Sequence, residues 1–143
     1  AFQLTNIARD IVDDAAIGRV YVPEQWLRSR GIPIDEIEDM RHRESLAVLA
    51  AELVETAEPY YDSAMQGLSA LPLRSAWSVA TARDVYRAIG RQVRAKGSHA
   101  WDSRVRTTSL QKVWFAARGA GVAIAARALP HSKRKQFLWN RGR

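Results

Sequence analysis

Apolar residues along the chain recur at the three- and four-residue spacing of helices that bury one side. This spacing predicts a long helix over about 42–68 and a second over about 72–96, which should begin at Pro72 and end at Gly97. The second helix is expected to bury a broad apolar face made of Trp77, Val79, Ala80, Ala82, Val85, Tyr86, Ile89 and Val93.

Shorter signals lie on either side of these two helices. Residues 23–30 favour a short helix, and residues 32–40 favour a loop or a single helical turn. Ser109 is expected to cap a last helix that runs to about Leu129. No stretch alternates apolar and polar residues over the length of a strand. The pattern therefore predicts one all-α domain over the whole chain, 1–143.

The opening segment carries a row of polar side chains inside apolar sequence. At 100° per residue, an arc of roughly 80° holds Gln3, Asn6, Asp10 and Asp14. Apolar residues cover most of the remaining circumference, which is typical of a buried helix. Buried carboxylates need a cationic partner or a bound cation. Oxygen ligands one helical turn apart are what Mg²⁺ takes together with the phosphates of a substrate.

A simpler interpretation of this row stays open. Asp and Asn near the start of a chain also cap helices and carry surface charge, and Asp10 could pair with Arg9 or Arg19. The row continues, however, into a helix stop at Gly18 and an extended segment. Together they form the string Q-x-x-N-I-A-R-D-I-x-x-D-x-x-x-x-R-x-Y-x-P, which ends at Pro23. Its length and variety favour a functional signature.

This string resembles the second aspartate-rich signature of the squalene and phytoene synthases. The resemblance extends to E-P-Y-Y at 58–61, L-P-L-R-S-A-W at 71–77 and V-Y-R-A-I-G at 85–90, where the chain is similar to the bacterial phytoene synthases in particular. It implies a helical bundle of the class I isoprenoid synthase type. The implied activity is that of a Mg²⁺-dependent prenyltransferase, with Mn²⁺ as an alternative metal. Two molecules of the prenyl diphosphate substrate, geranylgeranyl diphosphate, would join head to head through prephytoene diphosphate to phytoene, in carotenoid biosynthesis.

The resemblance also implies roles for single residues. Metal ligation is implied for Asn6, Asp10 and Asp14. The implied catalytic residues are Asp10, Asp14 and Arg9. Substrate contact is implied for Gln3, Arg9, Arg19, Tyr21, Tyr86 and Arg104. Arg19 and Tyr21 could equally anchor their loop. Taken alone, Tyr86 is a core tyrosine, and Arg104 is a surface arginine paired with Asp102.

Charge is divided between the two halves of the chain. Residues 1–66 hold 13 Asp and Glu against 6 Arg, whereas residues 67–143 hold 16 Lys and Arg against 2 Asp. A basic half can bind nucleic acid, an anionic membrane or a diphosphate. No nucleic-acid-binding motif accompanies it, so we expect no nucleic acid partner. The basic tail over about 131–143 favours disorder. We expect a cytoplasmic protein, for which peripheral contact at the inner face of the membrane stays open.

Composition excludes several other classes of site. The chain has no Cys, which rules out disulfides and thiolate metal sites, and its three His lack zinc-ligand spacing. No apolar run reaches the length of a membrane span, and the chain start is not a signal peptide. Gly119-Ala120-Gly121 lies within a predicted helix without a preceding strand, so it does not indicate a dinucleotide site. Oligomeric state is not readable from the sequence.

Two alternatives to phytoene synthesis remain. One is a C30 dehydrosqualene or squalene-type synthase that uses farnesyl diphosphate, and the other is a non-catalytic, membrane-associated helical bundle. The absence of any nicotinamide-site signal disfavours a reductive squalene synthase. Since the chain starts inside a helix motif at Ala1, the resemblance implies a C-terminal half without the first aspartate-rich helix, inactive on its own.

Overall fold

The computed structural model describes residues 1–128. Its α-helices within this range are α1 (Phe2–Ala15), α2 (Glu24–Arg28), α3 (Arg43–Gln66), α4 (Leu73–Lys96) and α5 (Ser109–Ala128). The connecting 3₁₀ helices are η1 (Ile34–Glu36), η2 (Met40–His42), η3 (Leu68–Ala70) and η4 (Gly97–His99). The described residues contain no strand, so the all-α prediction is confirmed. The predicted basic tail, 131–143, lies outside the described residues.

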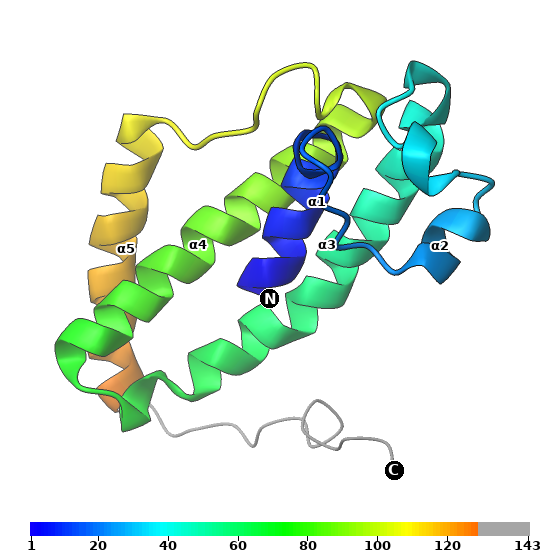
Figure 1. Ribbon diagram of the computed structural model, residues 1–143. Coiled ribbons are helices and arrows are strands. Elements are labelled where there is room, and N and C mark those ends of the chain that lie inside the picture. Colours follow the sequence, from blue (N-terminus) through cyan, green and yellow to red (C-terminus); the bar gives the residue numbers. More distant parts are fainter. Residues whose placement is uncertain (129–143) are drawn as a thin grey trace, which may run out of the picture.

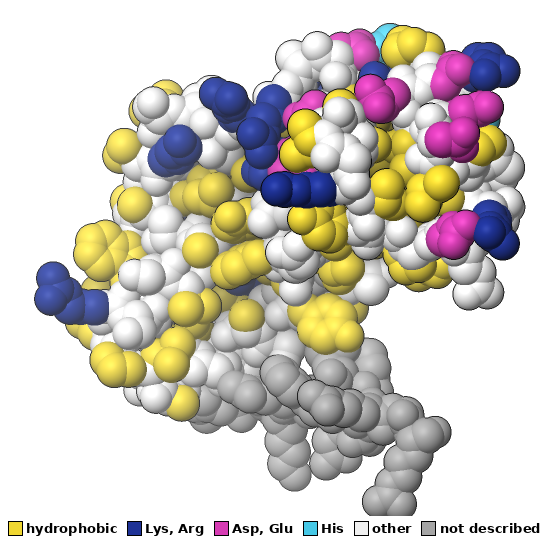
Figure 2. Space-filling model, viewed as in Figure 1, with side chains coloured by type: hydrophobic (Ala, Val, Ile, Leu, Met, Phe, Trp, Pro, Cys, Tyr) yellow, Lys and Arg dark blue, Asp and Glu magenta, His cyan; other side chains and the backbone are white. Residues whose placement is uncertain are grey.

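The helices are arranged around a hairpin of the two longest ones (Figure 1). Helices α3 and α4 run in opposite directions and are joined by a short connection that contains η3. Helix α1 packs against both of them, and α5 packs along α4. The acidic side chains on the face in Figure 2 gather over α2 and its neighbouring segments, away from α5. On this face the acidic side chains are thus separated from α5.

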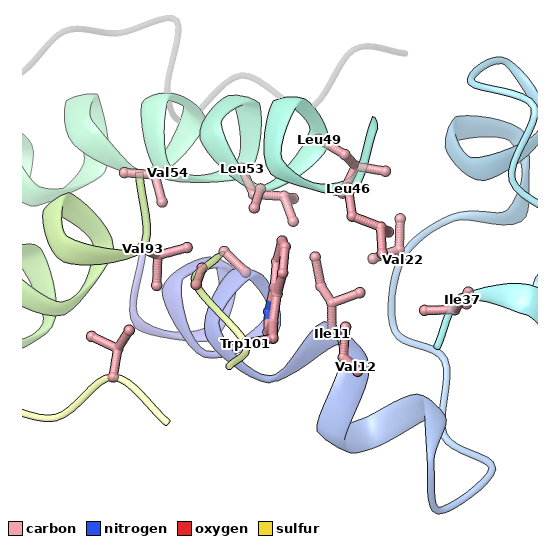
Figure 3. Packing of buried hydrophobic residues seen from close by; sticks show 14 of the residues in the cluster. Ile11, Val12, Val22, Ile37, Leu46, Leu49, Leu53, Val54, Val93 and Trp101 are labelled. Carbon is pink, nitrogen blue, oxygen red and sulfur yellow. The ribbon is translucent and has the colours of Figure 1, made fainter. Parts of the chain in front are cut away.

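The main core lies between α1, α3 and the C-terminal part of α4 (Figure 3). Ile11 on α1 faces Leu46, Leu49 and Leu53 on α3, and Trp101 after η4 fills the space between the two helices. All of these side chains are buried. Burying a leucine or isoleucine side chain contributes about 1.5–3 kcal/mol, so this cluster is what holds α1 against the hairpin.

A second, smaller cluster joins α5 to α4. It consists of Leu68, Ala76, Ala80 and Ala123, with partly buried residues around them. The small side chains let the two helices come close together, and Gly119 on α5 lies directly against Thr81 on α4. A Cβ atom placed on Gly119 would meet the Thr81 hydroxyl oxygen at 2.4 Å. The glycine is therefore needed for the contact between α4 and α5.

The predicted helix boundaries are close to those observed. Helix α4 begins directly after Pro72 and ends at Gly97, whose φ of 55° is favourable for glycine. Helix α2 forms within the predicted 23–30, and η1 supplies the single turn expected within 32–40. Among the described residues, no helix combines the length and the apolar character needed to cross a bilayer.

Two details of the sequence interpretation are wrong. Ser109 is the first residue of α5 and not its cap, because Thr108 takes that place. The Thr108 hydroxyl accepts from the Gln111 amide at 3.2 Å, and the Gln111 side chain accepts from the Thr108 amide at 2.9 Å, a reciprocal capping box. Trp77 is 45% exposed, because its indole reaches sideways to donate to the Ala116 carbonyl at 2.7 Å.

Candidate functional site

The polar row of α1 is buried at its centre and open at its ends. Asp10 is buried, Asn6 and Asp14 are half-buried, and Gln3 is exposed at the first turn. The expectation of a helix buried all round therefore holds only for the middle of α1, where α3 and α4 pack against it. This burial makes Asp10 the residue of the row that most needs a cationic partner.

Asp10 has two guanidinium partners in the structure. Arg9 donates through Nε to Oδ1 at 2.8 Å and through Nη2 to Oδ2 at 2.6 Å. Arg104, which precedes α5 in the chain, donates to the same Oδ2 at 3.1 Å. Burial alone would raise the pKa of Asp10, but the hydrogen bond and charge of Arg9, joined by those of Arg104, outweigh it and lower the pKa. The carboxylate is therefore held in its charged form.

These contacts decide two of the open alternatives. The pairing of Asp10 with Arg9, which the simpler interpretation allowed, forms, whereas Arg19 makes no side-chain contact with the row among the described interactions. The alternative pairing of Arg104 with Asp102 is wrong, because Asp102 binds His99 at 2.8 Å. Arg104 instead crosses to Asp10, 94 residues away in the sequence. The structure thus brings one predicted substrate contact onto a predicted metal ligand.

Asn6 presents an acceptor without a donor. Its Oδ1 atom is buried and has no hydrogen-bond partner among the described residues. Buried polar atoms in folded proteins are nearly always paired, so an unpaired amide oxygen one turn before Asp10 calls for an explanation. A cation bound between substrate phosphates and this side of α1 would supply the missing partner.

Asp14 and Tyr21 meet at the other end of the row. Both line a narrow crevice walled by the apolar side chains of Ile7, Ile11 and Val22. The backbone amide of Arg19 donates to the Asp14 carbonyl at 2.8 Å, which fixes the turn after α1. Arg19 itself is exposed, so its observed contact is that of a loop anchor. Gln3 takes part in no contact with Asp10 or Asn6 among the described interactions.

A larger pocket opens beside the row, between α1, α4 and the segment before α5. It has a volume of about 240 Å³, and both Arg9 and Tyr86 line it. The ring of Tyr86 stacks on that of Phe2, with the ring centroids 4.7 Å apart. The pocket is lined by three basic residues and by an apolar wall: Arg9, Arg106, Lys112, Val85, Ile89 and Val105. A cationic mouth next to an apolar wall suits a ligand with an anionic head and a hydrocarbon tail.

Sequence reasoning missed the other two basic residues of this pocket, Arg106 and Lys112. Only their position in the sequence could have indicated them. They lie two and eight residues after Arg104, on either side of the capping box that starts α5. The described residues contain no group of three His, Asp or Glu side chains arranged to hold a metal ion. Any cation at this row would therefore need ligands from a substrate or from outside this range.

Known proteins resemble this chain along nearly its whole length. The family model for squalene/phytoene synthase matches residues 1–111. A 15-cis-phytoene synthase of Enterobacter agglomerans is 49% identical over 141 residues, which are 99% of this chain and 48% of that protein. A 15-cis-phytoene synthase of Pantoea ananas is 48% identical, and a phytoene synthase of Pseudescherichia vulneris is 46% identical. Both alignments cover 99% of this chain and 46% of the relative.

The chain thus spans about half the length of the curated relatives that it matches. No solved structure matches it. The family match covers α1, the α3–α4 hairpin and the segment that carries Arg104, and it includes the lining of the pocket beside Asp10 except Lys112. On this match, and on relatives nearly half identical along the whole chain, the protein belongs to the squalene/phytoene synthase family.

Proposed function

We propose that this protein contributes one half of a phytoene synthase site, which joins two geranylgeranyl diphosphates head to head to form phytoene. The observation that carries the proposal is the pocket beside Asp10, where Arg9, Arg106 and Lys112 converge on an apolar wall. A prenyl diphosphate has the matching chemistry, a highly charged head and a long hydrocarbon tail. The identity to named phytoene synthases along 99% of the chain supports the same substrate class.

The basic residues would bind the diphosphate and stabilise its negative charge as the carbon–oxygen bond breaks. Guanidinium groups suit this task because each can donate two parallel hydrogen bonds to phosphate oxygens. Arg9 lies both on Asp10 and on the pocket wall, so it links the carboxylate to the anion. Preorganised cations next to a leaving anion stabilise the charge that develops in the transition state.

The polar row offers the oxygen ligands that Mg²⁺, or Mn²⁺ in its place, would need. Asn6, Asp10 and Asp14 would hold the metal, since Asn6 Oδ1 is buried without a partner among residues 1–128 and Asp10 is held ionised. When bound, Mg²⁺ would neutralise charge on the departing diphosphate. The side chains of Val85, Ile89 and Val105 would keep water from the reactive allylic carbon.

The substrate assignment predicts a preference for the C20 diphosphate. We suggest a chimera in which this chain replaces the matching segment of the Enterobacter agglomerans relative, because the chain covers 48% of that protein. Given equal geranylgeranyl and farnesyl diphosphate with Mg²⁺, the chimera should form mainly the C40 hydrocarbon. Product chromatography decides the matter: a dominant C30 product would assign the chain to the dehydrosqualene or squalene type, the weaker alternative.

We also propose peripheral contact with the inner face of the membrane for a cytoplasmic enzyme. The outward side of α5 carries Leu110, Val113, Trp114 and Ile124, which are 62–80% exposed, and α5 contains no acidic residue. Apolar and aromatic side chains beside basic ones favour an anionic bilayer surface. The chain should sediment with anionic vesicles, and a smaller fraction of the Trp114→Ser variant should sediment with them. Equal sedimentation of both proteins would contradict this contact.

A further inference from the structure

A second hollow lies on the other side of α4 from the proposed active site. It has a volume of about 250 Å³ and opens between α4 and α5. We call it the arginine pocket, since its wall consists mainly of Arg83, Asp84, Arg87, Arg91, Phe115 and Arg118. At 100° per residue, Arg83, Arg87 and Arg91 point roughly opposite to the α4 residues that line the pocket beside Asp10. The two sites are therefore separate.

The floor of the arginine pocket is fixed by a buried network. Arg83 donates to the Tyr61 carbonyl at 2.8 Å and to Asp84 at 2.8 Å, and both side chains are less than a tenth exposed. Arg118 of α5 binds the same carboxylate, which ties α5 to α4. These contacts hold the guanidinium groups of Arg83 and Arg118 in place without a ligand, which is the condition for a preorganised site.

Cations exceed anions around the hollow. Asp84 is shared by Arg83 and Arg118, and the α3 carboxylates of Asp62 and Glu58 are used by Arg83 and Arg87. Arg91 has no ion-pair partner in the part of the chain that the structure describes, and the buried Nε of Arg87 has no acceptor there. Four guanidinium groups thus share three carboxylates.

A purely structural ion-pair network would be expected to close up and balance its charge. This network instead leaves an open volume of about 250 Å³ between like charges. A water molecule takes up about 30 Å³ in the liquid, so the hollow has room for an anion of several atoms. Guanidinium forks match phosphate oxygens in geometry as well as in charge.

We propose that the arginine pocket binds a phosphate-type anion, such as inorganic phosphate, diphosphate or the phosphate of a larger molecule, at a site separate from Asp10. Arg91 and Arg118 would bind it from the two sides of the opening, over the fixed Arg83 floor. The ligand would bridge α4 and α5 and relieve the repulsion among the arginines. This proposal does not depend on the reaction proposed above.

The test uses the 143-residue chain in EDTA at constant ionic strength, with inorganic phosphate and diphosphate as probes in isothermal titration calorimetry. Binding should saturate, and Arg91→Gln should weaken it about tenfold, the loss expected for a charge-assisted hydrogen bond. Arg91→Lys keeps the charge but loses the paired guanidinium donors, so its affinity for the probes should lie between those of the parent and of Arg91→Gln. Arg91 is exposed and unpaired within the described range, so the variants should keep the helical circular dichroism of the parent.

Two matched variants control the result. Arg94→Gln removes the next arginine of α4, which pairs with Glu55 at 3.0 Å and does not line the pocket, so the affinity should not change. Arg106→Gln removes a cation from the pocket beside Asp10 and should leave the Arg91-dependent binding intact.

A parallel titration with vesicles containing phosphatidic acid, against phosphatidylcholine alone, separates a lipid headgroup from a free anion. Arg91-dependent binding of the soluble probes supports a free anion, and Arg91-dependent binding only to phosphatidic acid supports a headgroup. Binding that Arg91→Gln and Arg94→Gln weaken equally, or no saturable binding in either arm, would overturn the proposal.

Discussion

Asp10→Asn should lower the turnover of the chimera with geranylgeranyl diphosphate and Mg²⁺ by at least about a hundredfold, the scale on which losing an electrostatic contact in an active site acts. The substitution keeps the shape of the side chain and removes its charge. Arg9 and Arg104 then face a neutral amide, and the polar row loses its buried anionic oxygen. Steady-state turnover measures the effect, and circular dichroism should show unchanged helicity.

Asp13→Asn is the matched control for this experiment. Asp13 lies on the same helix, projects about 100° away from Asp14 and is exposed. Its substitution should change turnover by less than about twofold, as surface changes away from a site usually do. If Asp10→Asn kept turnover near that of Asp13→Asn, Asp10 would have no role in the reaction.

Gly119→Ala should destabilise the chain by about 1–3 kcal/mol, the usual penalty for overpacking a close contact. A Cβ at this position would meet Thr81 Oγ1 at 2.4 Å and the Thr81 backbone nitrogen at 3.0 Å. The side chain can rotate away, but the backbone nitrogen cannot, so α5 must shift from α4. Urea unfolding monitored by circular dichroism measures the loss.

Gly121→Ala should have the opposite sign. Apart from its chain neighbours and the backbone of its own helix, no atom of the described residues lies within 4 Å of a Cβ at Gly121, and the position is inside α5. Alanine in place of glycine in a helix interior gains up to about 1 kcal/mol. Two glycine substitutions two residues apart should therefore move the unfolding midpoint in opposite directions. A loss of stability in both would show that the close contact of α5 with α4 is not what distinguishes them.

The helices were predictable from sequence because their periodicity and end signals are local. Pro72 and Gly97 mark the ends of α4 directly. The errors came from competition among neighbours: Thr108 and Ser109 are both good caps, and only the Gln111 partner selects Thr108. Trp77 follows the apolar spacing of α4, yet its indole is drawn to a carbonyl of α5, which the pattern of one helix does not encode.

The polar row was also predictable, since it lies within one helix. The sequence did not show how residues far along the chain come to face this row. Arg104 reaches Asp10 across 94 residues, and Arg106 and Lys112 join Arg9 only because the segment before α5 folds back over α4. The charge cluster of the arginine pocket is likewise a product of packing, because Arg118 meets Asp84 from a different helix.

We propose that the polar row of α1 binds the divalent cation of the reaction. Anomalous scattering from crystals of the chimera grown with Mn²⁺ and inorganic diphosphate locates that cation directly. Mn²⁺ should lie about 2 Å from an Asp10 carboxylate oxygen, with diphosphate oxygens completing its coordination. Mn²⁺ bound elsewhere, while Arg9 and Arg104 still occupy both oxygens of Asp10, would contradict it.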